Sequence, residues 1–202
     1  MNVVFDLGGV VVRWQPDHLI ASVFDAPEVR AAVRREIIDH PDWLALDRGV
    51  LAKDEAVVRA VQRTGLAADQ VERLLDSVPA SLVVMPDTVA LMRRVRAHGH
   101  ALYCLSNMQH ASIAYLEREH DYWDVFSGAV ISSRIQLIKP EPAVYAYLLQ
   151  TFGLRGEETV FIDDTAVNLP PAQALGIKTI RFENAAQCER ELRALGCFEP
   201  SQ

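Results

Sequence analysis

Near its start the chain reads Val3-Val4-Phe5-Asp6-Leu7-Gly8-Gly9-Val10-Val11-Val12, and this stretch decides the fold. A short run that is rich in valine and punctuated by glycine predicts a buried strand of a parallel sheet. Asp6 interrupts the run, and a carboxylate at the end of a buried strand is costly to desolvate unless another group pairs with it. Since ligands of open α/β sheets bind at the carboxyl ends of the strands, Asp6 is a candidate functional residue.

Further along the chain, short apolar runs alternate with segments of helical periodicity. The runs that predict strands are Val3–Val12, Ala101–Leu105, Gly128–Ser132, Thr159–Ile162 and Lys178–Arg181. The segments that predict helices are Asp87–His98, Gln109–His120, Pro142–Phe152, Leu169–Leu175 and Ala185–Leu195. Four of these segments are followed by glycines that we expect to end the helices, namely Gly99, Gly153, Gly176 and Gly196. The alternation predicts an α/β fold with a Rossmann-like, doubly wound and mostly parallel sheet.

The segment from Trp14 to Met85 has a different texture, with no clear strand. Its apolar residues fall at helical spacing, as in Ala56, Val57, Ala60 and Val61. We therefore predict a helical cap over residues 14–85, inserted into a catalytic core made of residues 1–13 and 86–202. An insertion after the first strand would hang over the carboxyl edge of the sheet, above Asp6.

The composition limits the classes of partner. The chain has 202 residues, of which 50% are hydrophobic and 23% charged, and its formal net charge is -7. Without a basic surplus we expect neither a nucleic acid nor an anionic membrane as partner. No basic signal segment is visible and nowhere do about 18 apolar residues run together, so no membrane span is expected. The three cysteines lack ligand-type spacing, which favours a reducing compartment, and we expect a cytoplasmic protein.

Chemically active side chains follow three of the predicted strands. Asp6 follows the first strand, the pair Ser106-Asn107 follows a later one, and the pair Asp163-Asp164 follows another, while Lys139 lies in a loop. In a parallel sheet these strand ends share one edge, so the side chains are expected to converge. Phosphoryl transfer needs a nucleophile, a metal site and cationic or hydrogen-bonding groups around the phosphoryl oxygens, and this set supplies them.

In this order the motifs resemble those of the haloacid dehalogenase superfamily of phosphatases and phosphotransferases. The residues that carry the resemblance are Phe5-Asp6-Leu7-Gly8-Gly9-Val10, Leu105-Ser106-Asn107, Lys139-Pro140 and Phe161-Ile162-Asp163-Asp164. The resemblance covers nearly the whole chain. It is closest to the subgroup with a C1-type helical cap that contains bacterial sugar-1-phosphate phosphatases and the N-terminal phosphatase domain of some epoxide hydrolases.

The resemblance implies a role for each residue of the set. Asp6 would be the nucleophile and form an aspartyl-phosphate that water later hydrolyses. Mg²⁺ would be held by the carboxylates of Asp6 and Asp164 and by the backbone carbonyl of Gly8, all hard oxygen ligands. The remaining roles are phosphate binding by Ser106 and the Asn107 backbone, charge neutralisation by Lys139, and orientation of that lysine by Asp163.

One departure from the family pattern concerns the general acid. Most phosphatases of the family carry a second aspartate two positions after the nucleophile, where this chain has Gly8. A missing general acid costs roughly 10²–10⁴-fold in rate when the leaving group needs a proton. The cap residues His40, Asp42 and Asp47 are candidates to replace it, and the sequence does not choose among them.

Other cap residues allow two interpretations. Trp14 and Trp43 either line a substrate pocket or belong to the core of the cap, and the core is the commoner place for a tryptophan in a helical lobe. The pair Arg48-Gly49 either faces the active site or forms an ordinary turn. Residues 165–168 are expected to form a loop that supports Asp164.

The sequence thus predicts a Mg²⁺-dependent phosphatase acting on a small phosphate ester, with a sugar phosphate implied by the resemblance and a monomer or homodimer as the assembly. Two alternatives stay open. One is a metal-independent dehalogenase, since dehalogenases of the superfamily also lack the second aspartate. The other is a catalytically weak regulatory protein that binds Mg²⁺ and phosphate.

Overall fold

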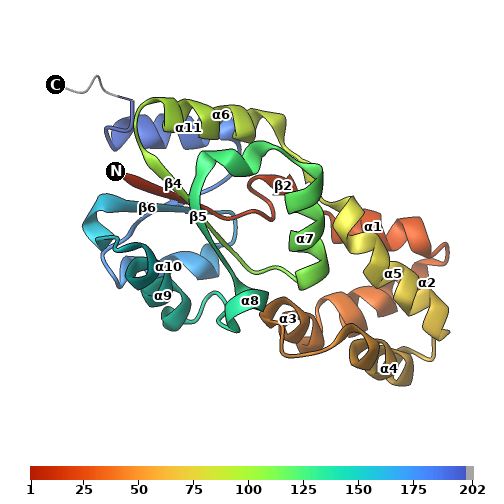
Figure 1. Ribbon diagram of the computed structural model, residues 1–202. Helices are drawn as coiled ribbons and strands as arrows, with labels where there is room; N and C mark the ends of the chain where they lie inside the picture. Colours follow the sequence, from red (N-terminus) through yellow and green to blue (C-terminus); the bar gives the residue numbers. More distant parts are fainter. Residues whose placement is uncertain (199–202) are drawn as a thin grey trace.

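A five-stranded parallel sheet forms the centre of the larger lobe in this computed structural model, which describes residues 1–198 (Figure 1). The strands are β1 (Asn2–Phe5), β4 (Ala101–Ser106), β5 (Phe126–Ile131), β6 (Thr159–Asp163) and β7 (Lys178–Arg181). Their order is β5-β4-β1-β6-β7, and every neighbouring pair is parallel. The predicted α/β fold with a doubly wound sheet is therefore confirmed.

Helices cover both faces of this sheet, because successive side chains of a strand point to opposite faces. Val3 and Phe5 of β1 pack in one cluster with residues of α6 (Pro86–Ala97), α7 (His110–Glu119) and α11 (Ala185–Ala194). Val4, between them, packs in another cluster with residues of α9 (Pro142–Phe152) and α10 (Leu169–Gln173). A strand that is buried on both faces explains the almost continuous apolar run of the sequence.

The five helices predicted after residue 86 are all present, each with bounds within two residues of the prediction. The glycines expected to end four of them, Gly99, Gly153, Gly176 and Gly196, all have positive φ angles. Shorter elements complete this lobe: α8 (Ser132–Ile135) and the 3-10 turns η2 (Tyr122–Val125), η3 (Gly156–Glu158) and η4 (Ala166–Asn168).

The first apolar run differs from the prediction of a single strand. The sheet strand ends at Phe5, a turn of residues 7–11 follows, and the short strand β2 (Val12–Arg13) leaves the sheet. β2 pairs antiparallel with β3 (Val83–Val84), so the prediction of no strand between Trp14 and Met85 was wrong at β3. A two-residue strand is too short to show a period in sequence, and it exists through a partner about 70 positions away.

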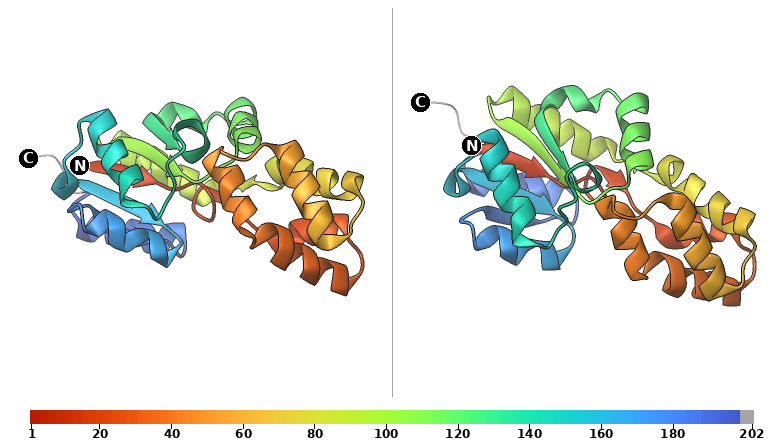
Figure 2. Two further views of the ribbon diagram at one scale, coloured as in Figure 1. Left: turned by 90° about the horizontal axis from the view of Figure 1, so that it is seen from below. Right: turned by 60° about the horizontal axis from the view of Figure 1, so that its bottom comes forward.

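Between β2 and β3 the chain is helical and forms the smaller lobe of Figure 2. Its elements are α1 (Pro16–Val23), α2 (Pro27–Val33), the π-helical turn η1 (Arg34–Ile38), α3 (Pro41–Arg48), α4 (Lys53–Thr64) and α5 (Ala68–Ser81). Buried apolar residues from Leu19 to Val78 form a hydrophobic cluster of their own. This second core supports the proposal that residues 14–85 are a cap domain.

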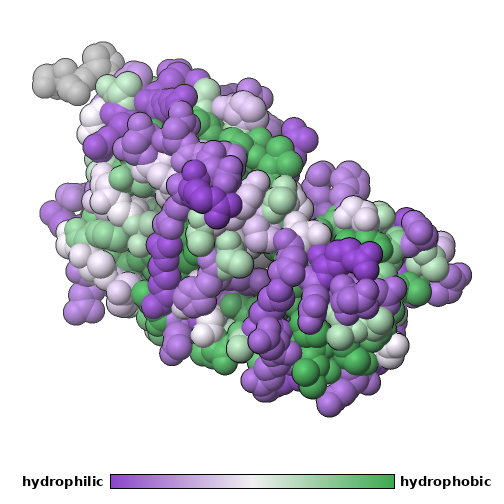
Figure 3. Space-filling model, turned by 45° about the vertical axis from the view of Figure 1, so that its right-hand side comes forward, coloured by the Kyte–Doolittle hydropathy of each residue, from purple (hydrophilic) through white to green (hydrophobic). Residues whose placement is uncertain are grey.

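The surface is mixed in polarity, as expected from a chain that is 50% hydrophobic and 23% charged. On the face drawn in Figure 3, hydrophilic and hydrophobic side chains are interspersed over both lobes. The cysteines Cys104, Cys188 and Cys197 are all buried as free thiols. Among residues 1–198, no helix combines the length and apolar character that crossing a membrane requires.

Candidate active site

A buried ion-pair network lies at the carboxyl edge of the sheet. Lys139 Nζ lies 2.9 Å from Asp6 Oδ2 and 2.7 Å from Asp163 Oδ2, and all three side chains are buried. Burial alone would lower the pKa of Lys139, but the charges of Asp6 and Asp163 outweigh it and raise that pKa. Lys139 is therefore positively charged beside the predicted nucleophile.

Asp163 uses its carboxylate to hold this lysine in place. Besides Lys139 it accepts hydrogen bonds from the backbone N–H of Thr165 at 2.8 Å and from Asn168 Nδ2 at 3.1 and 3.0 Å. The sequence indicated that residues 165–168 support Asp164: Thr165 does so, with its hydroxyl donating to Asp164 Oδ1 at 3.2 Å, whereas Asn168 supports Asp163 instead. Its spacing of five residues after Asp163 is the one sequence signal that could have pointed to it.

Asn107 connects the β4 end to the lysine loop. Its Nδ2 donates to the backbone carbonyl of Lys139 at 3.0 Å, and its Oδ1 accepts from the backbone N–H of Lys139 at 2.9 Å. These two bonds fix the backbone of Lys139, so the Asn107 side chain has a positioning role that the sequence had not indicated.

Ser106 presents a buried hydroxyl with no hydrogen bond of ordinary geometry among the described residues. The hydroxyl lies near enough to Asp6 to lower the pKa of that carboxyl slightly. Buried polar atoms are nearly always paired in folded proteins, so an unpaired hydroxyl beside Asp6 points to a partner that binds there. A phosphoryl oxygen is such a partner.

Three carboxylates form the acidic cluster of the site. Oxygen atoms of Asp6, Asp163 and Asp164 all lie within 4.8 Å of one another. Asp163 accepts hydrogen bonds from Thr165 and Asn168 in addition to its ion pair with Lys139, so Asp6 and Asp164 are the better placed carboxylates for a cation. Hard oxygen ligands of this kind fit Mg²⁺, which binds proteins through one or two carboxylates and retains several waters.

The protonation of this cluster reflects its burial. Burial raises the pKa of Asp6 to about 7, with Lys139 opposing and Asp163 adding to the shift. Burial also raises the pKa of Asp164, and the nearby Asp163 adds to that shift. A bound divalent cation would offset both effects, since an opposite charge favours the ionised carboxylate.

The two glycines after Asp6 differ in their surroundings. Gly9 has a φ angle of 76°, and a Cβ on it would lie 2.1 Å from Asp164 Oδ2. A Cβ on Gly8 would meet no heavy atom within 4 Å, and Gly8 lines the pocket. There is therefore room for a side chain at position 8, and lack of space does not explain why a glycine stands there instead of the family's aspartate.

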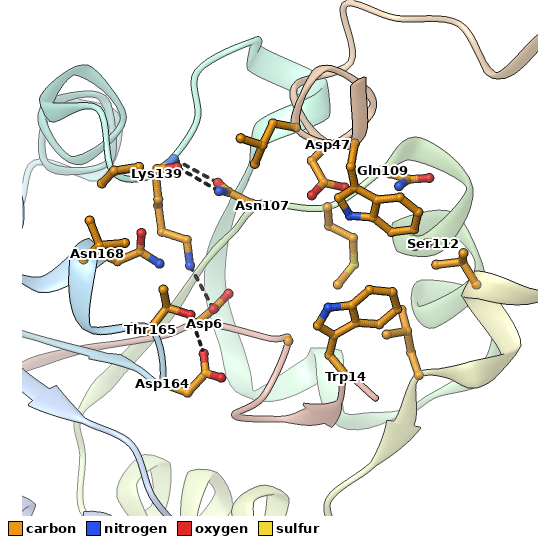
Figure 4. A pocket seen from close by; sticks show the side chains of 18 residues that line it. Asp6, Trp14, Asp47, Asn107, Gln109, Ser112, Lys139, Asp164, Thr165 and Asn168 are labelled. Carbon is orange, nitrogen blue, oxygen red and sulfur yellow. Dashed lines mark hydrogen bonds and ion pairs between the residues drawn. The ribbon is translucent and has the colours of Figure 1, made fainter. Parts of the chain in front are cut away.

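A pocket of about 390 Å³ opens above these residues and is lined by both lobes (Figure 4). The apolar side chains that line it are Trp14, Trp43, Leu44, Val78, Leu82, Met108, Pro140 and Val167. The rings of Trp14 and Trp43 stack with their centroids 5.5 Å apart. Both tryptophans line the pocket. Trp43 also packs in the core of the cap, so it is both a pocket residue and a core residue.

The structure separates the three candidates for the general acid. Asp42 is bound by Arg59 at 3.2 Å and by Arg63 at 2.6 Å; these bonds outweigh burial and lower the pKa of Asp42. The ring of His40 accepts a hydrogen bond from the Asp42 backbone. Neither residue lines the pocket, whereas Asp47 does.

Arg48 and Gly49 join the two lobes. Arg48 Nη1 donates to Glu141 Oε2, next to α9, at 3.0 Å. Gly49 has a φ angle of 77°, and a Cβ on it would lie 2.4 Å from the backbone oxygen of Ser133 in α8. This pair therefore does not line the pocket but fixes α3 against the larger lobe.

Comparison with known proteins shows the family of this chain. A family model for haloacid dehalogenase-like hydrolases matches residues 1–176. The chain is 26% identical over 195 residues to the sesquiterpene phosphatase astK of Aspergillus oryzae, covering 96% of both chains. It is also 26% identical over 152 residues to the (S)-2-haloacid dehalogenase H-109 of Pseudomonas putida, covering 71% of this chain and 68% of that one. It spans 35% or less of several longer relatives.

Among solved structures, the fold is similar to that of the HAD family enzyme bt-2542 of Bacteroides thetaiotaomicron. The TM-score is 0.73 at 21% identity, over 90% of this chain and 93% of that chain, and the structure is of a mutant of that enzyme in complex with magnesium and inorganic phosphate. With the family model matching most of its length, this chain is a hydrolase of the haloacid dehalogenase-like family.

Proposed function

We propose that the protein is a Mg²⁺-dependent phosphatase that hydrolyses a small phosphate monoester through an aspartyl-phosphate on Asp6. The observation that supports this most is the group formed by the Asp6–Lys139 pair, the carboxylate of Asp164 close to it and the buried hydroxyl of Ser106. Together these supply a nucleophile, a cation site and a phosphate ligand within one buried corner.

Each residue has a role in this proposal. Asp6 attacks phosphorus through one carboxylate oxygen, and Lys139 neutralises charge on the phosphoryl oxygens. Ser106 and the backbone of Asn107 donate hydrogen bonds to those oxygens. Asp6, Asp164 and the carbonyl of Gly8 would hold Mg²⁺, which neutralises phosphoryl charge when bound.

The pocket wall supports an apolar substrate. Apart from Asp47, the residues that line it from the cap side are tryptophan, leucine and valine, and such a wall favours a hydrocarbon group over a sugar that needs many hydrogen bonds. The relative astK is a sesquiterpene phosphatase, which fits a substrate of this class. The sugar phosphate implied by the sequence stays a prediction, as do the cytoplasmic location and the monomer or homodimer.

A dehalogenase is the second candidate, favoured by the likeness to the dehalogenase H-109 and by Gly8. The position of Asp164 argues against it, because its carboxylate lies within 4.8 Å of Asp6. Three carboxylates, Asp6, Asp163 and Asp164, thus meet one cation, Lys139, and a further cation would balance their charge.

The test is phosphate release from p-nitrophenyl phosphate, a prenyl monophosphate and a panel of sugar phosphates, with Mg²⁺ and with EDTA. The wild type is compared with Asp6→Asn and with Asp76→Asn, which removes an exposed cap carboxylate outside the pocket. We expect turnover that needs Mg²⁺ and Asp6 and that is unaffected in Asp76→Asn. Halide release from 2-haloacids without phosphate release would establish the dehalogenase instead.

A further inference from the structure

Asp47 lines the pocket and has no role in the chemistry proposed above. Figure 4 shows its side chain reaching into the pocket beside Gln109, with Asp6 and Lys139 on the other side. The described cap-side residues that line the pocket are Trp14, Trp43, Leu44, Asp47, Val78 and Leu82. Asp47 is the one titratable side chain among them.

The direction of phosphoryl transfer points towards this residue. The attacking and leaving oxygens lie roughly in line with phosphorus between them. Since Asp6 attacks from the sheet edge, the leaving oxygen points away from the sheet and towards the cap wall. Water that later attacks the aspartyl-phosphate approaches along the same line, so one group on that wall can serve both steps.

The backbone of Asp47 is held firmly against the larger lobe. The hydroxyl of Ser132 donates to the carbonyl of Asp47 and accepts from the backbone N–H of Met108 at 2.9 Å. Met108 follows the phosphate-binding pair Ser106-Asn107. This chain of hydrogen bonds ties the position of Asp47 to that of the phosphate site.

We propose that Asp47 is the general acid and base of the phosphatase, taking the place of the aspartate that Gly8 replaces; this inference rests on the proposed function. In the first step the bond from phosphorus to the leaving oxygen breaks as Asp6 bonds to phosphorus, and the Asp47 carboxyl gives its proton to that oxygen. In the second step water attacks phosphorus and gives a proton to the Asp47 carboxylate. The Asp6–phosphorus bond then breaks, and both carboxyl groups return to their initial states.

The electrostatic surroundings suit this double role. Burial raises the pKa of Asp47 to about 7; the charge of Asp6 adds to the shift and Gln109 opposes it. A group with a pKa near the working pH serves as both acid and base. The arginines on α3 and on the elements packed against it are all paired with other carboxylates. The pairs are Arg48 with Glu141, Arg59 and Arg63 with Asp42, Arg134 with Glu117, Arg34 with Asp39, and Arg35 with Glu36. Lys53 of α4 pairs with Asp76, which leaves Asp6 as the main charge acting on Asp47.

The test uses two esters that differ in their need for a proton. In Asp47→Asn we expect kcat for n-hexyl phosphate, which leaves as an alkoxide, to fall by roughly 10²–10⁴-fold. With p-nitrophenyl phosphate, whose leaving group needs no proton, we expect a burst of one nitrophenolate per active site followed by slow turnover. The decline of the hexyl phosphate rate above about pH 7, caused by ionisation of Asp47, should disappear in this variant.

Two further variants separate proton transfer from structural effects. Because position 8 has open space, adding Gly8→Asp to Asp47→Asn should restore hexyl phosphate turnover to within about tenfold of wild type if proton transfer is what was lost. Asp42→Asn removes the rival carboxyl and should leave the ratio of the two ester rates unchanged. Melting temperatures of all variants establish that each is folded.

Three outcomes would overturn the proposal. They are unchanged hexyl phosphate turnover in Asp47→Asn, an equal loss on both esters without a burst, and a double variant that stays as slow as Asp47→Asn. If the wild type releases phosphate neither from these two esters nor from any ester of the panel above, the proposed function fails and this role fails with it. Normal Mg²⁺-dependent and Asp6-dependent turnover in the wild type separates that failure from a failure of Asp47 alone.

Discussion

At the level of single residues, the site contains two adjacent glycines, Gly8 and Gly9, of which only Gly9 is required by the backbone conformation and by packing. Gly9 needs both a left-handed backbone and the absence of a side chain, because Asp164 packs directly against it. Gly8 needs neither, since its φ angle is not positive and a Cβ would find open space. The two positions look alike in the sequence, and their roles are set by what lies above each of them.

Substitution of Gly9 should therefore act on the metal site. In Gly9→Ala the new Cβ would displace the Asp164 carboxylate, and we expect Mg²⁺ affinity to fall by about 10–100-fold, as when a group that orients a metal ligand is lost. The measurement is Mg²⁺ titration by calorimetry, with the Mg²⁺ dependence of phosphate release alongside it.

Gly99→Ala is the matched control for that prediction. Gly99 has a φ angle of 84° and no heavy atom within 4 Å of a built Cβ, so it carries the same backbone strain of about 1–2 kcal/mol without the contact. Equal losses of Mg²⁺ affinity in the two variants would show that backbone strain, not displacement of Asp164, is responsible.

Among the elements, α3 is the one that brings the cap to the active site. Its C-terminal end is fixed to the larger lobe by the Ser132–Asp47 hydrogen bond, the Arg48–Glu141 ion pair and the contact of Gly49 with Ser133. These three contacts come from consecutive residues, so a small shift of this end of α3 moves Asp47 and the apolar wall together.

Gly49→Ala should produce such a shift, because its Cβ would lie 2.4 Å from the backbone oxygen of Ser133. We expect kcat/KM for phosphate esters to fall by about 10²-fold, the effect of misplacing reacting groups by about 1 Å. Steady-state kinetics measure this, and acrylamide quenching of tryptophan fluorescence in a Trp123→Phe background reports on access to Trp14 and Trp43.

Gly65→Ala controls for the strain in Gly49→Ala. Gly65 also ends a cap helix, with a φ angle of 69°, but a Cβ on it would contact nothing within 4 Å. Full activity in Gly65→Ala with a loss in Gly49→Ala assigns the effect to the junction between the lobes. Similar activities in both variants would contradict the proposed role of the α3 end.

For the whole molecule, the main feature is that the cap has a hydrophobic core of its own, separate from the two clusters that cover the faces of the sheet. One cluster runs from Leu19 to Val78, and the clusters of the larger lobe draw on residues outside that range. The connection through β2 and β3 has two residues in each strand. Because the apolar cluster of the cap is separate from those of the sheet, we expect the cap to unfold locally while the sheet stays folded.

Matched leucine substitutions test this organisation. Leu74 in the cap core and Leu102 in the sheet are both 0% exposed, and each change to alanine should cost about 2–5 kcal/mol. In Leu74→Ala we expect amide hydrogen exchange to accelerate in α1–α5 while β1, β4 and β6 stay protected; in Leu102→Ala the sheet should lose protection. Equal loss of protection in both lobes in Leu74→Ala would mean that the molecule unfolds as a single unit.

The sequence alone was enough to predict most of the larger lobe. Its strands are buried on both faces and its helices alternate with them, so each element shows in the local pattern, and the parallel topology brings their polar ends together. The prediction that residues after β1, β4 and β6 converge needed only this topology. For the same reason Asp6, Ser106 and Asp164 could be grouped before any distance was known, whereas Lys139, which lies in a loop, joined the group through the family resemblance.

The tertiary structure decided what depends on contacts between distant segments. β3 exists through pairing with β2, Asn168 matters through Asp163, and the choice of Asp47 over His40 and Asp42 follows from which face of the cap meets the pocket. Local patterns fix which faces of a helix are apolar, but not which neighbouring element each end of it meets. The proposed nucleophile and cation site could therefore be located from the order of the strands in the sequence, whereas the cap side of the pocket was determined by how α3 packs against α8.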